Sequence, residues 1–324
     1  MPLNRTQMAY GTFMLRYVAS VWDARSRLRD GPVVQAPWPL SFEQLSQAQG
    51  LVLYVCRLRR NYDEGTRFQI KNLADRAFVL INGRLSLVLA RTGDHTVARL
   101  PAPAKAGDSL GVMVENTGRD SSGRPDVKGM FVVIIDGDTP SGWTMHRLGL
   151  GHMNISRINQ QIQHIAGHPL RADQKRRRRI RAALLSAIRA KPVMLPALFS
   201  FQLDLPPQVG AVADTFLQVP TAFQHGLAFL NGVPLGRYYS SSLDDVHNEL
   251  IQGPRKRRIR KLFVPASMLL GPGQENEVVL LEFQSAACFP LCFAQLTTSS
   301  TATTAAPTPI VTIDIHSRKN AGFA

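Results

Sequence analysis

The chain lacks the motifs that mark a nucleotide-binding, metal-binding or membrane-spanning protein. It contains no Gly-rich phosphate loop, and its His, Cys, Asp and Glu residues do not recur at the spacing of a zinc site. No apolar run approaches the roughly 20 residues that a helix needs to cross a bilayer. These absences predict no metal, no cofactor and no transmembrane segment.

A secretory signal is also missing from the N-terminus, which has no charged region followed by an apolar stretch. For the chain as it stands this predicts a cytoplasmic location. If the true N-terminus lies upstream, a lysosomal, vacuolar or secreted location becomes the expectation.

Cysteine is scarce, with three residues in 324. Cys288 and Cys292 are separated by three residues and are candidates for a small disulfide loop in an oxidising compartment. Cys56 lies within an apolar stretch, which predicts a buried small hydrophobic residue. Four histidines occur in one region without regular ligand spacing, so we expect no metal site from them: His146, His152, His164 and His168.

Acidic residues are outnumbered by basic ones, 23 to 38, which gives a net charge of +15. Two segments without acids, 175–191 and 255–261, carry eight and six of the positive charges, so the rest of the chain is nearly neutral. The basic character therefore belongs to insertions rather than to the body of the fold.

The first basic segment has helix-forming residues with apolar positions three and four apart. A basic amphipathic helix can bind RNA, anionic lipid or an acidic partner, and it can equally be a solvated helix that bridges two domains. Aromatic residues for base stacking are absent from it. Its candidate anion-binding residues are Lys175, Arg176, Arg177, Arg178, Arg179 and Arg181.

One strand-turn-strand pattern occurs twice, at 77–85 and 227–238. In each copy an apolar run leads directly into Asn-Gly, the pair that favours a type I′ hairpin turn. The turns are expected at Asn82-Gly83 and Asn231-Gly232. The repetition indicates two related β domains.

Short apolar runs bounded by turn residues occur along most of the chain, and 24 glycines and 21 prolines separate them. The pattern predicts an all-β protein of two sandwiches. We expect a first sandwich over 1–148, with residues 1–30 as a lead-in able to pair with either sandwich, a basic and partly helical insertion over 149–195, and a second sandwich over 196–324 with a Ser/Thr-rich tether at 297–309.

Several motifs occur in one order over most of the chain, among them Tyr10-Gly11-Thr12-Phe13, Asp126-Val127-Lys128-Gly129, Gly142-Trp143-Thr144 and Gly236-Arg237-Tyr238. Together these motifs resemble the region that follows the catalytic barrel in family-35 β-galactosidases. The resemblance implies two galactose-binding-like jelly rolls. It also implies that both catalytic glutamates lie on a barrel outside this chain, so we assign no catalytic residue here.

Glu115 and Glu282 are expected to occupy equivalent places in the two repeats, each after an apolar run. Retaining glycosidases need two carboxyl groups about 5 Å apart. No second carboxylate is spaced to share a site with either glutamate, so we expect both to have a structural role at a strand end.

Three hypotheses for function follow. The first is a non-catalytic β-sandwich portion of a β-galactosidase-like protein that is structural or binds a galactose-containing glycan. The second is a hydrolase component completed by a separate barrel chain, and the third is a basic adaptor for nucleic acid, membrane or an acidic partner. No ligand-binding residue is assigned, because Trp22, Trp38 and Trp143 are each expected to be packing residues.

Overall fold

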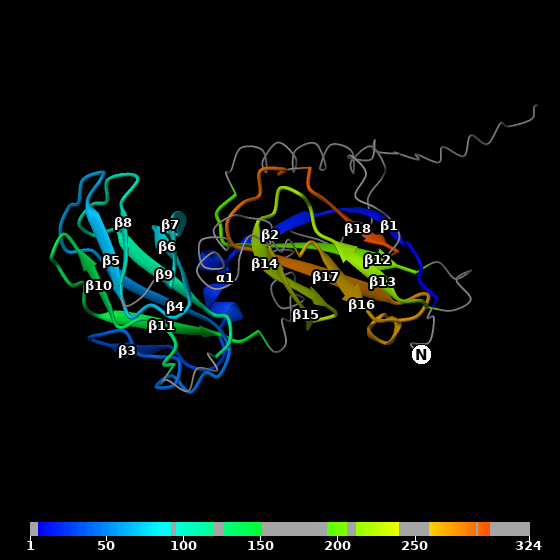
Figure 1. Cartoon of the computed structure of the whole chain (residues 1–324), viewed down its shortest axis with the longest axis horizontal. Coiled ribbons are helices and arrows are strands. Elements are labelled where there is room, and N and C mark those ends of the chain that lie inside the picture. The colour runs from blue at the N-terminus through cyan, green and yellow to red at the C-terminus, as the bar shows by residue number, and fades with distance from the viewer. Residues whose placement is uncertain are drawn as a thin grey trace, which may run out of the picture.

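The structure is a computed structural model and is shown in Figure 1. It describes residues 6–91, 95–119, 126–150, 193–205, 212–239, 259–289 and 291–298. Residues 151–192 of the predicted insertion, with its basic segment 175–191, lie outside the described part, as do three of the four clustered histidines and most of the Ser/Thr-rich tether. In the described part, no helix is long and apolar enough to cross a membrane.

The first sandwich has a six-stranded sheet in the order β3-β11-β4-β9-β6-β7 and a three-stranded sheet in the order β10-β5-β8. All neighbouring strands in both sheets are antiparallel. The strands are β3 (Val34–Ala36), β4 (Gly50–Arg57), β5 (Arg67–Lys71), β6 (Arg76–Ile81), β7 (Arg84–Ala90), β8 (His95–Arg99), β9 (Ser109–Asn116), β10 (Val132–Ile135) and β11 (Trp143–Leu148).

The second sandwich has a five-stranded sheet in the order β15-β14-β17-β12-β2 and a four-stranded sheet in the order β1-β18-β13-β16. The strands are β1 (Gly11–Met14), β2 (Arg16–Ser20), β12 (Ala197–Asp204), β13 (Thr215–Gln218), β14 (His225–Leu230), β15 (Val233–Tyr239), β16 (Lys261–Val264), β17 (Glu275–Glu282) and β18 (Phe293–Thr297). A short 3-10 helix, η1 (Ala266–Met268), follows β16. These two sandwiches confirm the prediction of an all-β fold.

The lead-in was expected to pair with either sandwich, and its two strands pair with the second. β1 is antiparallel to β18, and β2 is antiparallel to β12. Near the C-terminal end of the predicted insertion over 149–195, Val193 and Leu195 pack against the core of the second sandwich. The last residues of the range 149–195 therefore belong to the folded body.

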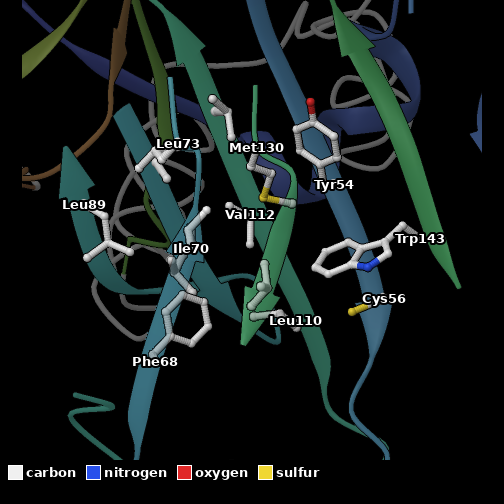
Figure 2. Packing of buried hydrophobic residues seen from close by; sticks show 14 of the residues in the cluster. Tyr54, Cys56, Phe68, Ile70, Leu73, Leu89, Leu110, Val112, Met130 and Trp143 are labelled. Atoms are coloured by element: carbon white, nitrogen blue, oxygen red, sulfur yellow. The ribbon is translucent and has the colours of Figure 1, made fainter. Parts of the chain in front are cut away.

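Each sandwich has its own apolar core, which its strands supply by alternate residues. In the first core, Phe68 and Ile70 of β5 face Val112 of β9, and Trp143 of β11 lies beside Cys56 of β4 (Figure 2). Trp143 is 1 % exposed and its indole N–H donates to the carbonyl of Pro140. It is a packing residue, as expected from the sequence.

A third apolar cluster joins the two sandwiches. The strands that line it are β4, β6, β9 and β11 of the first sandwich and β2, β12, β14 and β17 of the second. In β6, for example, Ala77 and Val79 belong to the first core while Phe78 and Leu80 belong to the third cluster. These sheets are therefore buried on both faces, which explains why their strands are continuous apolar runs rather than alternating ones.

The helix α1 (Val21–Leu28) follows β2 and lies at this interface (Figure 1). Its N-cap is Ser20, whose hydroxyl oxygen accepts a hydrogen bond from the backbone N–H of Asp23 at 3.0 Å. The helix places the indole of Trp22 against the β6–β7 turn, where a Cβ on Gly83 would lie 2.6 Å from the ring. Only glycine fits this turn beside the indole.

The two Asn-Gly turns have the same geometry in the two sandwiches. Both asparagines have φ of 51°, and the glycines that follow have φ of 81° and 83°. Asn82 N–H donates to the carbonyl of Ser109, and the Asn82 side-chain oxygen accepts from Ser109 N–H. Asn231 makes the same two bonds with Glu277. Each hairpin also has a register shift between the third and the second residue before its asparagine, at Val79/Leu80 and at Ala228/Phe229.

Trp38 was expected to be a packing residue, and this was wrong. It lies in the loop after β3 and is 52 % exposed. The motif Pro37-Trp38-Pro39 explains the difference, because the two prolines prevent this segment from forming a strand. The Trp38 side chain therefore does not point into the core as an alternate residue of a strand would. Trp22, in contrast, is partly buried against the third cluster.

Candidate functional site at the domain interface

A polar cluster lies within the apolar interface, centred on Glu115 near the end of β9. The Glu115 side chain is fully buried and receives two residues of the second sandwich. His225, at the start of β14, places Nε2 at 2.8 Å from Oε2, and Arg237 of β15 places Nε at 2.9 Å from Oε1. The Arg237 Nη2 also donates to the carbonyl of Asn116 at 2.8 Å. A carboxylate of one domain thus binds two side chains of the other.

The charges in this cluster follow from its contacts. Burial opposes ionisation of Glu115, but His225 and Arg237 outweigh it and lower the pKa of the carboxyl to about 2. Burial also lowers the pKa of His225, against the pull of Glu115. An ionised carboxylate can only accept, so we assign the hydrogen of the neutral imidazole to Nε2. The cluster is therefore a salt bridge with Arg237, supported by a hydrogen bond from His225.

Aromatic rings surround the imidazole. The ring centroid of His225 is 5.3 Å from that of Phe283 in the second sandwich and 6.2 Å from that of Phe78 in the first. Phe78 and Phe283 are themselves 4.8 Å apart. These rings keep water away from the cluster, so its electrostatic interactions act at a low effective dielectric.

Glu282, near the end of β17, holds the backbone that carries His225. Its carboxyl oxygens accept from the N–H groups of Gln224, His225, Gln284 and Ser285, at 2.9–3.3 Å. The Tyr238 hydroxyl donates to it as well, at 3.1 Å. Burial nevertheless raises the pKa of Glu282 to about 7, while the backbone donors act in the opposite direction. Glu282 is thus a structural residue that fixes the start of β14.

The expectation that Glu115 and Glu282 occupy equivalent places was wrong by one residue. The Asn-Gly turns bond to Ser109 and Glu277, so these two residues are equivalent, and six positions further on Glu115 corresponds to Phe283. Glu282 corresponds to Val114, which lies in the core of the first sandwich. A shift of one residue in a strand reverses the face, so the two glutamates belong to different environments. Among the residues that the structure describes, the hydrogen-bond partners of the two glutamates include no second carboxylate.

A second ionic cluster stabilises the loops of the first sandwich. Lys128 is 1 % exposed, and its Nζ lies 2.8 Å from an oxygen of both Asp75 and Asp126. Arg91 pairs with Asp126 at 2.8 Å. A buried ammonium with two carboxylates is electrically satisfied, which indicates a structural role rather than an open site. The motif Asp126-Val127-Lys128-Gly129 is thereby explained by folding.

The remaining sequence-based candidates are placed as follows. Cys288 and Cys292 form a disulfide, and Cys56 is buried with a pKa raised by burial to about 12. His146 lies on β11, where burial and then Arg25 and Arg29 lower its pKa. Among the described residues, no three His, Cys, Asp or Glu side chains gather as a metal site. The candidate anion-binding residues Lys175–Arg181 lie outside the described part.

Two family models match the chain: the first all-beta domain of beta-galactosidase over residues 39–149, and its galactose-binding domain over residues 196–275. The chain belongs to the β-galactosidase family. The first model covers the first sandwich from just after β3, and the second covers β12 to β16. This confirms the resemblance that the sequence motifs indicated.

Individual β-galactosidases match most of the chain at low sequence identity. The mouse β-galactosidase is 27 % identical over 294 residues, which cover 89 % of this chain and 40 % of the relative. The human β-galactosidase is 26 % identical over 293 residues, and β-galactosidase 17 of Arabidopsis thaliana is 24 % identical over 298. The chain thus spans about 40 % of the length of the β-galactosidases it matches.

Solved structures show only a distant likeness. A GH2 beta-galacturonidase from Eisenbergiella tayi bound to galacturonate is 13 % identical, with a TM-score of 0.22 over 86 % of this chain and 37 % of that one. A lectin from Pleurotus ostreatus in complex with GalNAc is 11 % identical, with the same TM-score over 83 % of this chain and 79 % of that one. Scores this low carry no functional argument.

Sequence reasoning did not single out His225 and Arg237 as partners of Glu115. One signal was available. Arg76 and His225 are the sixth residues before the two Asn-Gly turns, and each is a large polar residue at the start of an otherwise apolar strand. Both are buried, Arg76 at 8 % and His225 at 1 % exposed. A basic residue that opens a strand buried on both faces indicates a polar partner across the interface.

Proposed function

We propose that this chain is the non-catalytic, two-sandwich portion of a family-35-type β-galactosidase and that its role is structural. The observation that carries the proposal is the interface centred on Glu115. An apolar cluster from both sandwiches encloses the Glu115 carboxylate with its partners Arg237 and His225, and the buried Arg76 interacts electrostatically with the same carboxylate. Such an interface stabilises one arrangement of the two domains and so provides a rigid surface for a further domain.

The proposal predicts that the two sandwiches unfold together. Native-state hydrogen exchange followed by mass spectrometry should give the central strands of both sandwiches, β4 with β9 and β14 with β17, the same free energy of opening. Two separate values would mean that the interface does not couple the domains, and the structural proposal would fail.

A second candidate is a hydrolase component that acts with a separate catalytic part. It is favoured by the coverage of the relatives, of which about 40 % corresponds to this chain. The test is to assay the purified chain on a chromogenic β-galactoside. We expect no turnover, and turnover that is lost when Glu115 or Glu282 becomes Gln would contradict both the structural and the two-part proposals.

The disulfide supports an oxidising compartment for the protein. Bonds such as Cys288–Cys292 persist in secreted and lumenal proteins and are rare in the cytosol. We therefore propose a secreted or lysosomal location. The protein should be isolated from its natural source and alkylated without prior reduction. Mass spectrometry should then find no alkyl group on Cys288 or Cys292, and alkylation of either thiol would contradict this proposal.

A further inference from the structure

The outer face of the β1-β18-β13-β16 sheet exposes large apolar side chains in water. Leu217, Leu262 and Leu296 point into the second core, and the alternate residues of the same strands point away from it. On that outward face, Phe263 is 47 % exposed, Met14 45 % and Phe293 41 %. Figure 1 shows β13, β16 and β18 on the side of the second sandwich away from β4 and β9. Exposed groups of this size indicate a binding surface.

Strand register arranges this face in three parallel rows. Phe216 of β13 lies opposite Phe263 of β16, with ring centroids 5.4 Å apart and planes inclined at 56°. At the other end of the face, Met14 lies opposite Phe293. Between these two apolar pairs, Gln295 of β18 lies opposite Gln218 of β13. Side chains on one face of a strand recur about every 7 Å, so the two apolar rows are about 13 Å apart with an amide row between them.

The polar row is available to a ligand. Within the part of the chain that the structure describes, the side-chain amides of Gln218 and Gln295 take part in no hydrogen bond. Lys261 ends the row beside Gln218, and the paired residues of the three rows include no carboxylate. The described rows therefore offer neutral donors and acceptors between aromatic rings, with Lys261 as the one basic residue among them.

This arrangement fits a sugar better than other ligands. A protein-binding surface has a contiguous apolar centre with a polar rim, whereas here a polar row separates two apolar ones. Nucleic acid and anionic lipid need several basic residues, and among the described residues of the three rows only Lys261 is basic. A pyranose presents C–H groups to an aromatic ring and hydroxyl groups to amides, and it carries no charge. Because the aromatic rows are too far apart for one ring, the ligand has several residues.

We infer that the outer face of the β1-β18-β13-β16 sheet binds a neutral oligosaccharide. Phe263 and Phe293 stack against separate sugar residues, and Gln218 and Gln295 bond the hydroxyl groups between them. This binding goes beyond the proposed structural role and does not depend on the domain interface. The family model over residues 196–275, described as a galactose-binding domain, suggests galactosides as the first probes.

The test is isothermal titration of the full chain with lactose, a β-1,4-galactan tetrasaccharide and cellotetraose. We expect a tetrasaccharide to bind more tightly than the disaccharide. Phe263→Ala and Phe293→Ala should each weaken that binding about three- to tenfold, the loss of one aromatic stacking contact. Gln218→Ala should weaken it as well. All three positions lie on the outward face, so the fold should be retained, which circular dichroism checks.

Val97→Ala provides the control. Val97 is 48 % exposed on β8, in the first sandwich, and its substitution should leave sugar binding unchanged. The inference is overturned if no sugar of the panel binds, or if Phe263→Ala and Phe293→Ala bind as the unchanged chain does. It is also overturned if the chain dimerises in sedimentation and the same two variants are monomeric, since the face would then serve self-association. None of these results bears on the coupled unfolding of the two sandwiches.

Discussion

Replacing Glu115 should destabilise the protein more than replacing an exposed carboxylate does, because it leaves Arg237 without its counter-charge and the buried His225 without its hydrogen-bond acceptor. Glu115→Gln keeps the size of the side chain and one oxygen, but it removes the charge opposite Arg237. Hydrogen bonds to charged groups contribute about 1.5–3 kcal/mol, so we expect a loss of about 2 kcal/mol in the free energy of unfolding. Glu115→Ala removes both oxygens and leaves a cavity as well.

The expected loss for Glu115→Ala is about 3–4 kcal/mol. Breaking a buried ion pair by removing one partner costs about 3–5 kcal/mol. The Arg237 side chain is 29 % exposed, so its guanidinium regains some hydration and the effect falls in the lower part of that range. His225 has no such route to water, since its side chain is 1 % exposed.

Urea denaturation followed by circular dichroism measures these losses, and hydrogen exchange shows where they act. The matched control is Glu275→Gln, the same chemical change at an exposed position on β17, which should alter stability by less than about 0.5 kcal/mol. A double-mutant cycle between Glu115→Gln and Arg237→Gln should give a coupling of about 1–3 kcal/mol. If Glu115→Gln costs no more than the control, the cluster does not stabilise the interface and the reasoning fails.

Three further predictions concern a turn, a carboxyl group and the disulfide. Gly83→Ala should lower the free energy of unfolding by about 3 kcal/mol or more in urea denaturation, because the new methyl group clashes with the Trp22 indole and the backbone is strained as well. Gly107→Ala has the same strain but meets open space, and should lower it by about 1 kcal/mol. Equal losses for the two variants would contradict this. The folded state keeps a proton on Glu282 up to about pH 7, whereas the unfolded state releases this proton near the ordinary pKa of a glutamate. The free energy of unfolding, measured relative to that of Glu282→Gln, should therefore fall by up to about 3 kcal/mol as the pH rises from 4.5 to 7. A difference that does not change with pH would refute the raised pKa. Reduction of Cys288–Cys292 should lower the unfolding free energy by only about 2 kcal/mol, since the loop is short, and a larger loss in dithiothreitol would show that the bond holds more than its own loop.

Much of the fold could be predicted from sequence because its determinants are local. Asn-Gly fixes a hairpin turn by the φ that each residue tolerates, and two such turns with the same flanking pattern identified the repeat. The ends of the domains depend on long-range pairing, which local patterns do not report. β1 pairs with β18, which follows it by about 280 residues, so the side on which the lead-in docks was left open.

The candidate site was harder to predict, for two physical reasons. Glu115 is 110 residues from His225 and 122 from Arg237, and no local pattern connects them. The repeat alignment also slipped by one residue, because both strands read as nearly uniform apolar runs and give no alternation to fix the register. Strands buried on both faces lose the signal that would have separated Val114 from Glu115.

The same double-sided burial predicts that the unit of folding is larger than either matched domain. An isolated first sandwich would expose Leu53, Phe78 and Leu80 together with the unpaired carboxylate of Glu115. A second sandwich cut at residue 275 would lose β17 and β18, two strands that supply its core, and would also lack β1 and β2 from the start of the chain. The strands at the beginning of the chain close the domain at its end, and the face that this domain presents is buried by the other sandwich. The interface is therefore packed as a core is, and substitutions at Glu115 or His225 should destabilise both domains together.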